Sequence, residues 1–285
     1  MRSTRTAVKW EHRSWAAEPD DAGLLTRRAR VRAAGPYRAA LPARIVRLDV
    51  ALPSDMVTEV EEATAAVVRF DAEISRSLPG LNGDIAPLDA VLLWAESACS
   101  SQIEHITAGA RTLALATLGE RTRSNAALVA ANVRAMGAAS RLAADLDEPA
   151  LLSAHGALME GQDHARPGAY RDAQGWIGGG APTPHTAQFV PPHPERLRAG
   201  MDDLLAYLRR TDVPALVQAA LSHAQFETIH PFADGTGRTG RVLVHAVLHR
   251  AGTITRMGVP LSAGLLTDTA AYFDALTAYR DGDPA

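Results

Sequence analysis

A glycine-rich segment between two helix-forming stretches constrains this chain more than any other feature. The segment HPFADGTGRTGR spans residues 230–241, and Gly235, Gly237 and Gly240 spell G-x-G-x-x-G within it. In a dinucleotide fingerprint, this pattern follows a buried strand of a parallel sheet and precedes an acidic residue about 20 positions later. Here the preceding residues have helical periodicity, and residues 241–267 contain no aspartate or glutamate. The context therefore argues against a Rossmann fold.

Apolar residues recur at intervals of three and four along most of the chain, which predicts helices. The first clear stripe follows Ser54, a residue type that caps helices, and Ala/Leu-rich segments continue to about residue 145. We expect further helices at 148–160, 195–210, 212–230 and 238–250. The stretch 166–194 is dense in Gly and Pro and contains the β-forming runs GWI and QFV, which predict a hairpin with a long tip. The predicted fold is all-α, a helical bundle with one β-hairpin.

Three regions are expected along the chain. Residues 1–45 are rich in Ala, Pro and Arg, and residues 1–44 contain ten Lys/Arg against four Asp/Glu. Because this segment lacks clear periodicity, we predict a flexible basic arm, with nucleic-acid contact as the less favoured alternative. Residues 46–145 form the expected N-terminal helical region, and residues 146–285 the expected core that carries the glycine-rich segment.

The composition excludes several classes of protein. The net charge of −3 provides no overall attraction to nucleic acid or membranes. The single cysteine, Cys99, rules out an intramolecular disulfide framework, as is usual in a reducing cytosol. We find neither an apolar run that could span a bilayer nor the apolar core of a signal peptide. We therefore expect a cytoplasmic protein with no membrane partner.

The glycine-rich segment has the residues of an anion site. An ordinary tight turn needs its Pro, Asp and Gly, but it does not need a histidine at its entrance or two arginines in the next helix. Residues 235–237 can present consecutive backbone N–H groups, and the helix N-terminus adds further donors. Arg238 and Arg241 lie on one helix face, where both can bind phosphate oxygens.

Two further side chains in the segment suggest chemistry as well as binding. Asp234 would repel a phosphate directly, so its position makes sense if it holds Mg²⁺ against the phosphates. His230 is a side chain that titrates near neutral pH, as a general base does. The residues together point to phosphoryl or nucleotidyl transfer.

The segment resembles the signature of the Fic family, His-Pro-Phe-x-Asp-Gly-Asn-Gly-Arg-x-x-Arg. It departs from that signature at Thr236, where the family has asparagine. The runs RPGAYR, WIGG and FVPP are similar to the family's flap region. SSQIEH, residues 100–105, is similar to the family's inhibitory motif Ser/Thr-x-x-x-Glu-Gly/Asn, with His105 at the last position. Because this motif precedes the core, the chain resembles the class with an N-terminal inhibitory helix.

The resemblance implies a protein adenylyltransferase, which moves AMP from ATP to a Ser, Thr or Tyr hydroxyl of a target protein. It implies the Fic fold, with ATP as substrate and Mg²⁺ as cofactor. The implied roles are His230 as general base, Asp234 as the Mg²⁺ ligand, Gly235, Thr236 and Gly237 as the anion hole, Arg238 on the leaving phosphates and Arg241 on the γ-phosphate. At position 236, threonine keeps the backbone N–H and has a shorter hydroxyl donor than asparagine.

The resemblance also implies a docking flap and an inhibitory contact. In the family the flap binds the target segment by strand addition, and the corresponding residues here are Trp176, Ile177, Gly178, Phe189 and Val190. Ser100 and Glu104 are four residues apart and share a helix face. In autoinhibited members, the glutamate pairs with the second arginine, here Arg241, and removes its contact with the γ-phosphate. The alternative for Glu104 is an ordinary exposed glutamate.

Two other functions remain open. Glu104 could position water for the removal of AMP, which would make the protein a de-AMPylase. The chain could also be a non-catalytic module that senses a nucleotide. The expected partners are a target protein and ATP, a homodimer is one possible assembly, and nucleic acid is not expected. His245 and His249 have the i, i+4 spacing of metal ligands, but no third ligand accompanies them.

Overall fold

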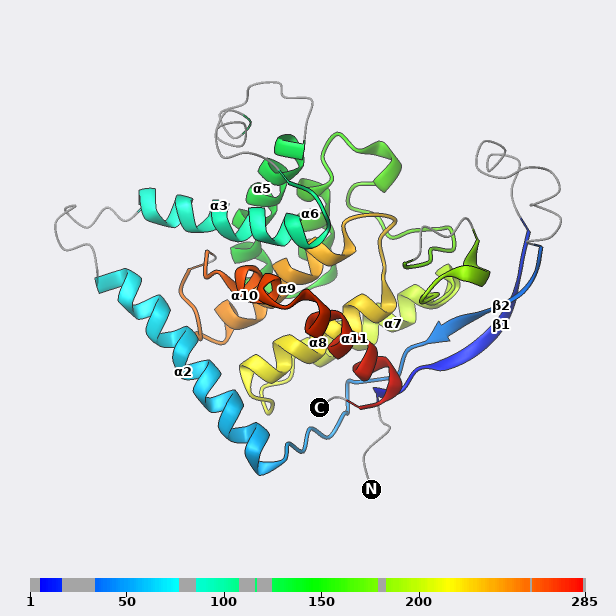
Figure 1. Cartoon of the computed structure of the whole chain (residues 1–285), viewed down its shortest axis with the longest axis horizontal. Coiled ribbons are helices and arrows are strands. Elements are labelled where there is room, and N and C mark those ends of the chain that lie inside the picture. Colours follow the sequence, from blue (N-terminus) through cyan, green and yellow to red (C-terminus); the bar gives the residue numbers. More distant parts are fainter. Residues whose placement is uncertain are drawn as a thin grey trace.

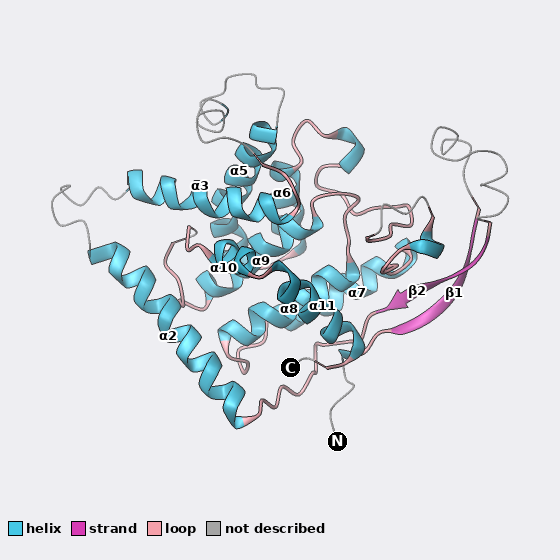
Figure 2. Cartoon of the chain, in the orientation of Figure 1, coloured by secondary structure: helices cyan, strands magenta, loops and turns pink. Residues whose placement is uncertain are grey.

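A computed structural model describes residues 6–16, 34–76, 86–107, 116, 125–178, 183–256 and 258–283 of the chain. Its elements are arranged around a central group of helices (Figures 1 and 2). In chain order they are β1 (Lys9–Trp15), β2 (Gly35–Leu41), α2 (Ser54–Arg76), α3 (Ala86–Ile103), α5 (Asn125–Asp145), α6 (Glu148–Leu158), α7 (Pro194–Leu208), α8 (Ala215–Ile229), α9 (Thr236–Arg250), α10 (Leu261–Thr267) and α11 (Thr269–Asp281). The all-α prediction is confirmed, because β1 and β2 form the one sheet among the described residues.

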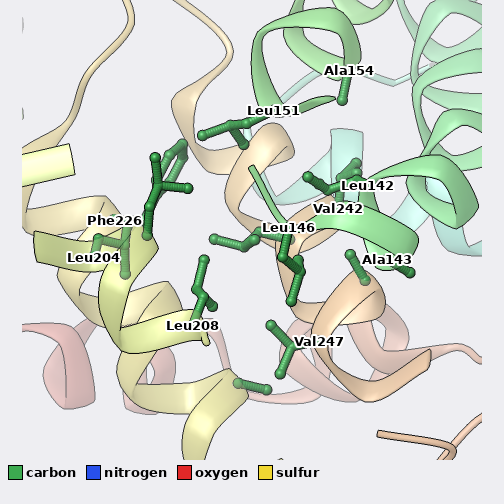
Figure 3. Close-up of a cluster of buried hydrophobic side chains, with 14 of the residues drawn as sticks. Leu142, Ala143, Leu146, Leu151, Ala154, Leu204, Leu208, Phe226, Val242 and Val247 are labelled. Carbon is green, nitrogen blue, oxygen red and sulfur yellow. The ribbon is translucent and has the colours of Figure 1, made fainter. Parts of the chain in front are cut away.

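One hydrophobic core joins helices from both halves of the chain (Figure 3). Its members include Leu142 of α5, Leu151 of α6, Leu204 of α7, Phe226 of α8 and Val242 of α9. Burial of each such side chain stabilises the fold by about 1.5–3 kcal/mol. α8 is buried along most of its length, and its buried residues include polar side chains such as Gln218 and His223 as well as apolar ones. The glycine-rich segment therefore begins inside the core.

The flanking helices follow the sequence pattern closely. In α2, Val60, Val67 and Phe70 pack against the core, as the predicted stripe requires. This helix runs along one edge of the molecule (Figure 1). α6 begins where the side chain of Asp147 accepts a hydrogen bond of 2.9 Å from the backbone N–H of Ala150. Such a cap satisfies one of the free donors at the start of a helix.

The N-terminal region differs from the prediction. β1 and β2 are antiparallel, with Lys9 opposite Leu41 and Trp15 opposite Gly35. The N–H of Ala40 donates to the carbonyl of Val190 at 2.9 Å, so the strand pair is attached to the flap region. The prediction of a flexible arm is therefore wrong for the strands, while residues 17–33 lie outside the described residues. That prediction rested on the excess of Lys/Arg and on the absence of clear periodicity in this segment.

The predicted flap hairpin is reduced to one antiparallel bridge, between Ile177 and Phe189. The N–H of Ile177 donates to the carbonyl of Phe189 at 2.8 Å, and the reverse bond measures 3.2 Å. The predicted hairpin tip includes residues 179–182, which lie outside the described residues. As for membrane contact, none of the described helices has both the length and the apolar sequence to span a bilayer.

Candidate active site

The segment 230–241 is a tight connection between α8 and α9. α8 ends at Ile229, and His230 adopts a left-handed conformation with φ 48° while its N–H donates to the carbonyl of Phe226 at 2.8 Å. Gly235 also has a positive φ, 77°, and precedes the first residue of α9. Left-handed backbone is rare outside glycine. The conformation of His230 therefore depends on the contacts around it.

Phe232 and His155 support this connection from inside the protein. Both side chains are fully buried, and their rings stack with centroids 3.6 Å apart. Nδ1 of His155 accepts the N–H of Gly168 at 3.0 Å, so Nε2 carries the proton and donates to the carbonyl of Asp234, also at 3.0 Å. Burial lowers the pKa of His155 to about 4, which keeps the ring neutral. His155 thus fixes the backbone at Asp234.

Arg171 connects the same segment to the flap. Its guanidinium is buried and donates to the carbonyls of His230 at 2.8 Å, Ala173 at 3.0 Å and Pro192 at 2.5 Å. Its own N–H donates to the carbonyl of Pro231 at 2.9 Å. Burial lowers the pKa of Arg171 to about 10, so it remains charged at neutral pH. One side chain therefore holds the backbone of the histidine and that of the flap together.

Arg238 lies in the first turn of α9, and some of its hydrogen-bond donors have no partner among the described residues. Its side chain is 2% exposed, and Nη2 contacts the sulfur of Met159 at 3.7 Å and a carboxylate oxygen of Asp234 at 3.6 Å. Within the described part of the chain, Nε and Nη1 have no hydrogen-bond partner. Unpaired buried donors are costly, and they are common where a ligand completes the site.

Arg241, one turn later, is hydrogen-bonded to other residues of the chain. Nε donates to the hydroxyl of Ser100 at 2.9 Å, and Nη2 donates to the carbonyl of Ser100 at 2.7 Å and to Oε1 of Glu104 at 2.9 Å. Ser100 and Glu104 thus meet Arg241 together, whereas the motif resemblance implied a contact of Arg241 with Glu104 alone. Glu104 itself follows the last residue of α3, Ile103, and lies in the turn that ends the helix.

The carboxylate of Glu104 also lies directly against the backbone of Gly237. A Cβ atom at Gly237 would be 2.0 Å from Oε1 of Glu104, closer than real Cβ contacts come. Gly237 is one of the residues predicted to form the anion hole. Oε1 therefore occupies space beside the predicted phosphate donors.

α3 is attached to α9 by a buried polar contact. Glu96 of α3 and His245 of α9 lie 3.0 Å apart, and both side chains are almost fully buried. The backbone N–H and the hydroxyl of Ser262, at the start of α10, also donate to Glu96, at 2.9 and 2.5 Å. His245 is thus a structural partner of Glu96, and its spacing from His249 does not mark a metal site.

The backbone turn after α3 explains the histidine in the inhibitory motif. His105 has a φ of 60°, the conformation that favours the Gly or Asn of the family pattern. Histidine is one of the non-glycine residues enriched in this region, so the turn is retained. The N–H groups of Glu104 and His105 bond back to the carbonyls of Ser101 and Gln102 at 3.1 and 2.9 Å.

The threonine in the glycine-rich segment points inward. Its side chain is 2% exposed, and the hydroxyl of Thr236 lies 3.3 Å from the N and 3.4 Å from the O of Phe232. The hydroxyl therefore closes the turn, and the group that Thr236 can present to a phosphate is its backbone N–H. The expectation of a hydroxyl donor toward the phosphate does not fit this orientation.

The electrostatics around His230 favour its neutral form. The side chain is 25% exposed. Burial of the ring, with Arg171 and Arg280 nearby, lowers the pKa of His230. Its Nδ1 lies 3.8 Å from Oε2 of Glu227, the residue one turn earlier on α8. Burial, together with the charge of Glu104, raises the pKa of Glu227 to about 7.

Asp234 is the carboxylate that could hold a metal ion here. Its side chain is 46% exposed, and Oδ2 lies 3.6 Å from Nε2 of the exposed His164. Among the described residues, no group of three or more His, Cys, Asp or Glu side chains surrounds a potential metal position. A single carboxylate suits Mg²⁺, which commonly completes its shell with water and substrate phosphates.

The predicted docking residues lie on both sides of the flap bridge. Phe189 and Val190 are buried, Trp176 and Ile177 are half-buried, and Gly178 is exposed with a φ of 83°. Phe189 and Val190 also line a groove between the β1–β2 pair and the flap, together with residues that include Trp10, Tyr37 and Arg38. The groove contains none of the residues of the glycine-rich segment.

Several residues of this site were not found from the sequence. His155, Met159, His164, Glu227 and Arg280 carry no motif of their own. Arg171 was noted only as part of RPGAYR. All but Glu227 come from distant parts of the chain, so composition and spacing held no signal for their roles. Glu227 lies three residues before His230.

Comparison with known proteins gives consistent results. A family model described as Fic/DOC family matches residues 145–248. A protein named protein adenylyltransferase Fic, from Nematostella vectensis, is 40% identical over 95 residues, which are 31% of this chain and 20% of that protein. The chain thus matches about a fifth of the length of this relative.

Solved structures extend the similarity beyond the matched segment. A Fic family protein from Desulfovibrio desulfuricans superposes with a TM-score of 0.63 and 25% identity, over 83% of this chain and 70% of that one. A Fic domain containing signaling protein from Bacteroides thetaiotaomicron gives a TM-score of 0.58 at 20% identity, over 77% and 86% of the two chains. The second likeness concerns the fold alone.

Proposed function

This chain is a Fic-domain protein, and from that premise we propose that it is an autoinhibited protein adenylyltransferase. It transfers AMP from ATP to the hydroxyl of a Ser, Thr or Tyr side chain on a target protein. The observation that carries the proposal is the position of Glu104, 2.9 Å from Arg241 and against Gly237. Glu104 belongs to the class of inhibitory motif that precedes the Fic core.

The anion site supports ATP as the substrate. Arg238 and Arg241 are buried, and Nε and Nη1 of Arg238 and Nη1 of Arg241 lack partners within the described residues. The N-terminus of α9 adds backbone N–H groups at Thr236 and Gly237. Charged donors of this kind bind phosphate oxygens strongly. In this proposal Arg238 contacts the leaving phosphates and Arg241 the γ-phosphate.

His230 is the proposed general base. It takes the proton of the target hydroxyl on Nε2 while the oxygen attacks the α-phosphorus. The O–H bond breaks, N–H and O–P bonds form, and pyrophosphate leaves with the electrons of the broken P–O bond. Its neutral state at pH 7 leaves a nitrogen lone pair for this proton.

Asp234 is the proposed ligand of Mg²⁺. When bound, the ion neutralises negative charge on the phosphates. The exposed carboxylate and the buried guanidinium of Arg238 at 3.6 Å place both charges on one side of the turn. His155 holds the Asp234 backbone, and so orients the carboxylate.

The flap is the proposed docking site for the target. Arg171 connects it to His230, so a segment bound at Ile177 or Phe189 would be held in a fixed relation to the base. Strand addition uses main-chain hydrogen bonds, which do not depend strongly on sequence.

Inhibition follows from competition for Arg241. A hydrogen bond to a charged group contributes about 1.5–3 kcal/mol, and 1.4 kcal/mol is a factor of ten. Because the Glu104 side chain is 40% exposed, the lower part of that range applies. We therefore expect relief of inhibition to raise the transfer rate by about ten- to fiftyfold.

The test is incubation of the full chain with labelled ATP, Mg²⁺ and a cell lysate. Glu104→Gly should label itself or a target about ten- to fiftyfold more than the natural sequence. The double variant Glu104→Gly with Arg241→Ala should lose that gain, and His230→Ala in the Glu104→Gly background should be inactive while still binding ATP.

Glu160→Gly is the matched control, since Glu160 also follows a helix and pairs with an arginine, Arg134, at the surface. It should leave the labelling unchanged. A folded, ATP-binding Glu104→Gly variant with no added activity would contradict autoinhibition. If Glu104→Gly instead loses an AMP-removing activity of the natural sequence, the de-AMPylase function replaces the proposed one.

A further inference from the structure

We propose that Glu227 is a positioning residue for His230, whose carboxylate accepts the Nδ1 proton and leaves Nε2 free to act as the base. The proposal rests on the proposed function, in which His230 receives the proton of the target hydroxyl. The motif resemblance assigns no role to position 227, which precedes the segment by three residues.

The geometry places the Glu227 carboxylate beside a buried ring nitrogen of His230. Oε2 of Glu227 lies 3.8 Å from Nδ1 of His230. Nδ1 of His230 is buried and has no side-chain hydrogen-bond partner among the described residues, and the backbone of Glu227 also lies near the ring. Oε2 is the carboxylate oxygen on the His230 side, while Oε1 faces Gly240. A movement of about 1 Å would bring the pair into hydrogen-bond range. Catalytic hydrogen bonds are often long before the substrate binds.

The backbone brings the two side chains together. Glu227 is in the last turn of α8, and His230 leaves the helix in a left-handed conformation. Arg171 and Arg280 hold this end of the helix through the carbonyls of His230 and Glu227, at 2.8 and 3.4 Å. The pair therefore lies on a fixed part of the chain.

Gly240 makes the space that Glu227 occupies. A Cβ at Gly240 would be 3.0 Å from Oε1 of Glu227 and 2.9 Å from Nδ1 of His223. In the R-x-x-R pattern of the segment, the residue at this position is unspecified. Its being glycine here is explained by the close packing of Glu227 and His223.

Charged and titratable groups face Glu227 from each neighbouring element. They are His223 from α8, His230 from the segment itself, Arg241 from α9, Tyr272 and Arg280 from α11, and Glu104 from the turn after α3. Burial and the Glu104 charge favour the neutral acid, while the two arginines favour the carboxylate. The balance keeps Glu227 near the point where it changes charge.

The two protonation states have opposite effects on His230. As a carboxylate, Glu227 accepts from Nδ1–H, so the lone pair is on Nε2 and the imidazolium formed after proton transfer is stabilised. As a neutral acid, Glu227 donates to Nδ1, so Nε2 carries a proton and cannot accept another. Because the Nδ1 atom is buried, Nε2 is the nitrogen that remains for a substrate.

The charge of Glu104 also affects the protonation of Glu227. This charge raises the pKa of Glu227, and removal of that charge lowers it. In the Glu104→Gly background, Glu227 should be a carboxylate over a wider range of pH. Release of the inhibitory turn would therefore free Arg241 and also favour the active tautomer of His230.

The first experiment needs no enzymatic activity. NMR of the full chain with ¹⁵N-labelled histidine reports which ring nitrogen of His230 carries the proton, with His230→Ala to assign the signal. At pH 8 the Nδ1–H form should dominate in the Glu104→Gly variant. Adding Glu227→Gln should change the proportion of tautomers by at least about threefold. Unchanged His230 signals would overturn the proposal.

The second experiment measures AMP transfer against pH in the Glu104→Gly background. Activity should rise with pH through the Glu227 titration, because the carboxylate is the active form, and loss of the Glu104 charge should move this rise to lower pH. Glu227→Gln should lose that limb and be about 10- to 100-fold slower at pH 8, part of the factor of about 10²–10⁴ that a general base contributes. Glu227→Asp should keep the limb at a reduced rate, because its carboxylate is further from Nδ1.

Controls separate this proposal from the proposed function. Glu195→Gln, at an exposed glutamate paired with Arg13, should leave the profile unchanged. If Glu104→Gly transfers no AMP, the proposed function fails, whereas the NMR result still decides the role of Glu227. A constant loss of rate at every pH, with unchanged His230 signals in a folded Glu227→Gln variant, would show a purely structural role and overturn the proposal.

Discussion

The two arginines of the glycine-rich segment are one turn apart and in opposite situations. Arg241 is occupied by Ser100 and Glu104, with three hydrogen bonds between 2.7 and 2.9 Å. Arg238 is as deeply buried, yet two of its three nitrogens have no partner in the described part of the chain. One side of the proposed anion site is thus closed by the protein itself and the other is not.

This difference is the basis for the proposed autoinhibition. Burial removes both guanidinium groups from water, which costs free energy unless another group takes the place of water. At Arg241 the inhibitory turn does so, and at Arg238 a ligand is the group that would. A nucleotide could therefore bind through the Arg238 side while the Arg241 side still holds Glu104. Nucleotide binding and AMP transfer would then depend on different residues, and the following variants test this expectation.

The largest effect is expected at Asp234, on the Arg238 side. In the Glu104→Gly background, Asp234→Ala should lower AMP transfer by about 100-fold or more, because charge neutralisation by a bound metal is worth several kcal/mol. Raised Mg²⁺ should not fully restore the rate. The control is Asp202→Ala, at an exposed residue of α7 paired with Arg198. Full activity in EDTA would contradict a metal role for Asp234.

A smaller effect is expected when each arginine is removed in turn. In the natural sequence, Arg238→Ala should weaken ATP binding by about tenfold or more, and Arg241→Ala should change it less than threefold. In the Glu104→Gly background both changes should weaken binding. Calorimetry with ATP measures the affinities of the four variants and of their two parent proteins. Thermal unfolding checks that each variant is folded. Equal losses of ATP affinity for Arg238→Ala and Arg241→Ala in the natural sequence would contradict the proposed difference between the two arginines.

The smallest effect concerns the two glycines of the anion hole. Gly237→Ala should destabilise the natural sequence by about 1–3 kcal/mol, because the new methyl group meets the Glu104 carboxylate. That cost should be largely absent in the Glu104→Gly background. Gly235→Ala should be costly in both backgrounds, since its φ is 77° and its Cβ would meet Met159 at 2.7 Å. Denaturant unfolding of the six proteins measures the coupling. A Gly237→Ala cost independent of Glu104 would show that the carboxylate is not held there.

The N-terminal region shows that composition did not predict the two paired strands. Its excess of arginine and its lack of helical period predicted an arm, but residues 9–15 and 35–41 pair with each other across 17–33. Tyr37 and Ala39 are buried with Val190 of the flap, so the partner of this strand pair is far away in sequence. Strand pairs of this kind are stabilised by such tertiary contacts.

Local pattern by itself determined the helical class and the position of the main helices, and it is the basis for the proposed anion site in the segment 230–241. These features depend on periodicity, on glycine and proline, and on residues close in the chain, so they can be read directly. The likeness of SSQIEH to an inhibitory motif also named Glu104 and its partner Arg241.

Only the tertiary structure decided what surrounds these residues. It placed Glu104 against Gly237, His155 beneath Phe232, Arg171 between the segment and the flap, and Glu227 beside His230. The inward turn of the Thr236 hydroxyl was decided in the same way. The physical reason is that shifted pKa values, unpaired donors and steric clashes arise when a group is buried. A pKa, an unpaired donor or a steric clash depends on every element packed around a group, and those elements come from distant parts of the chain.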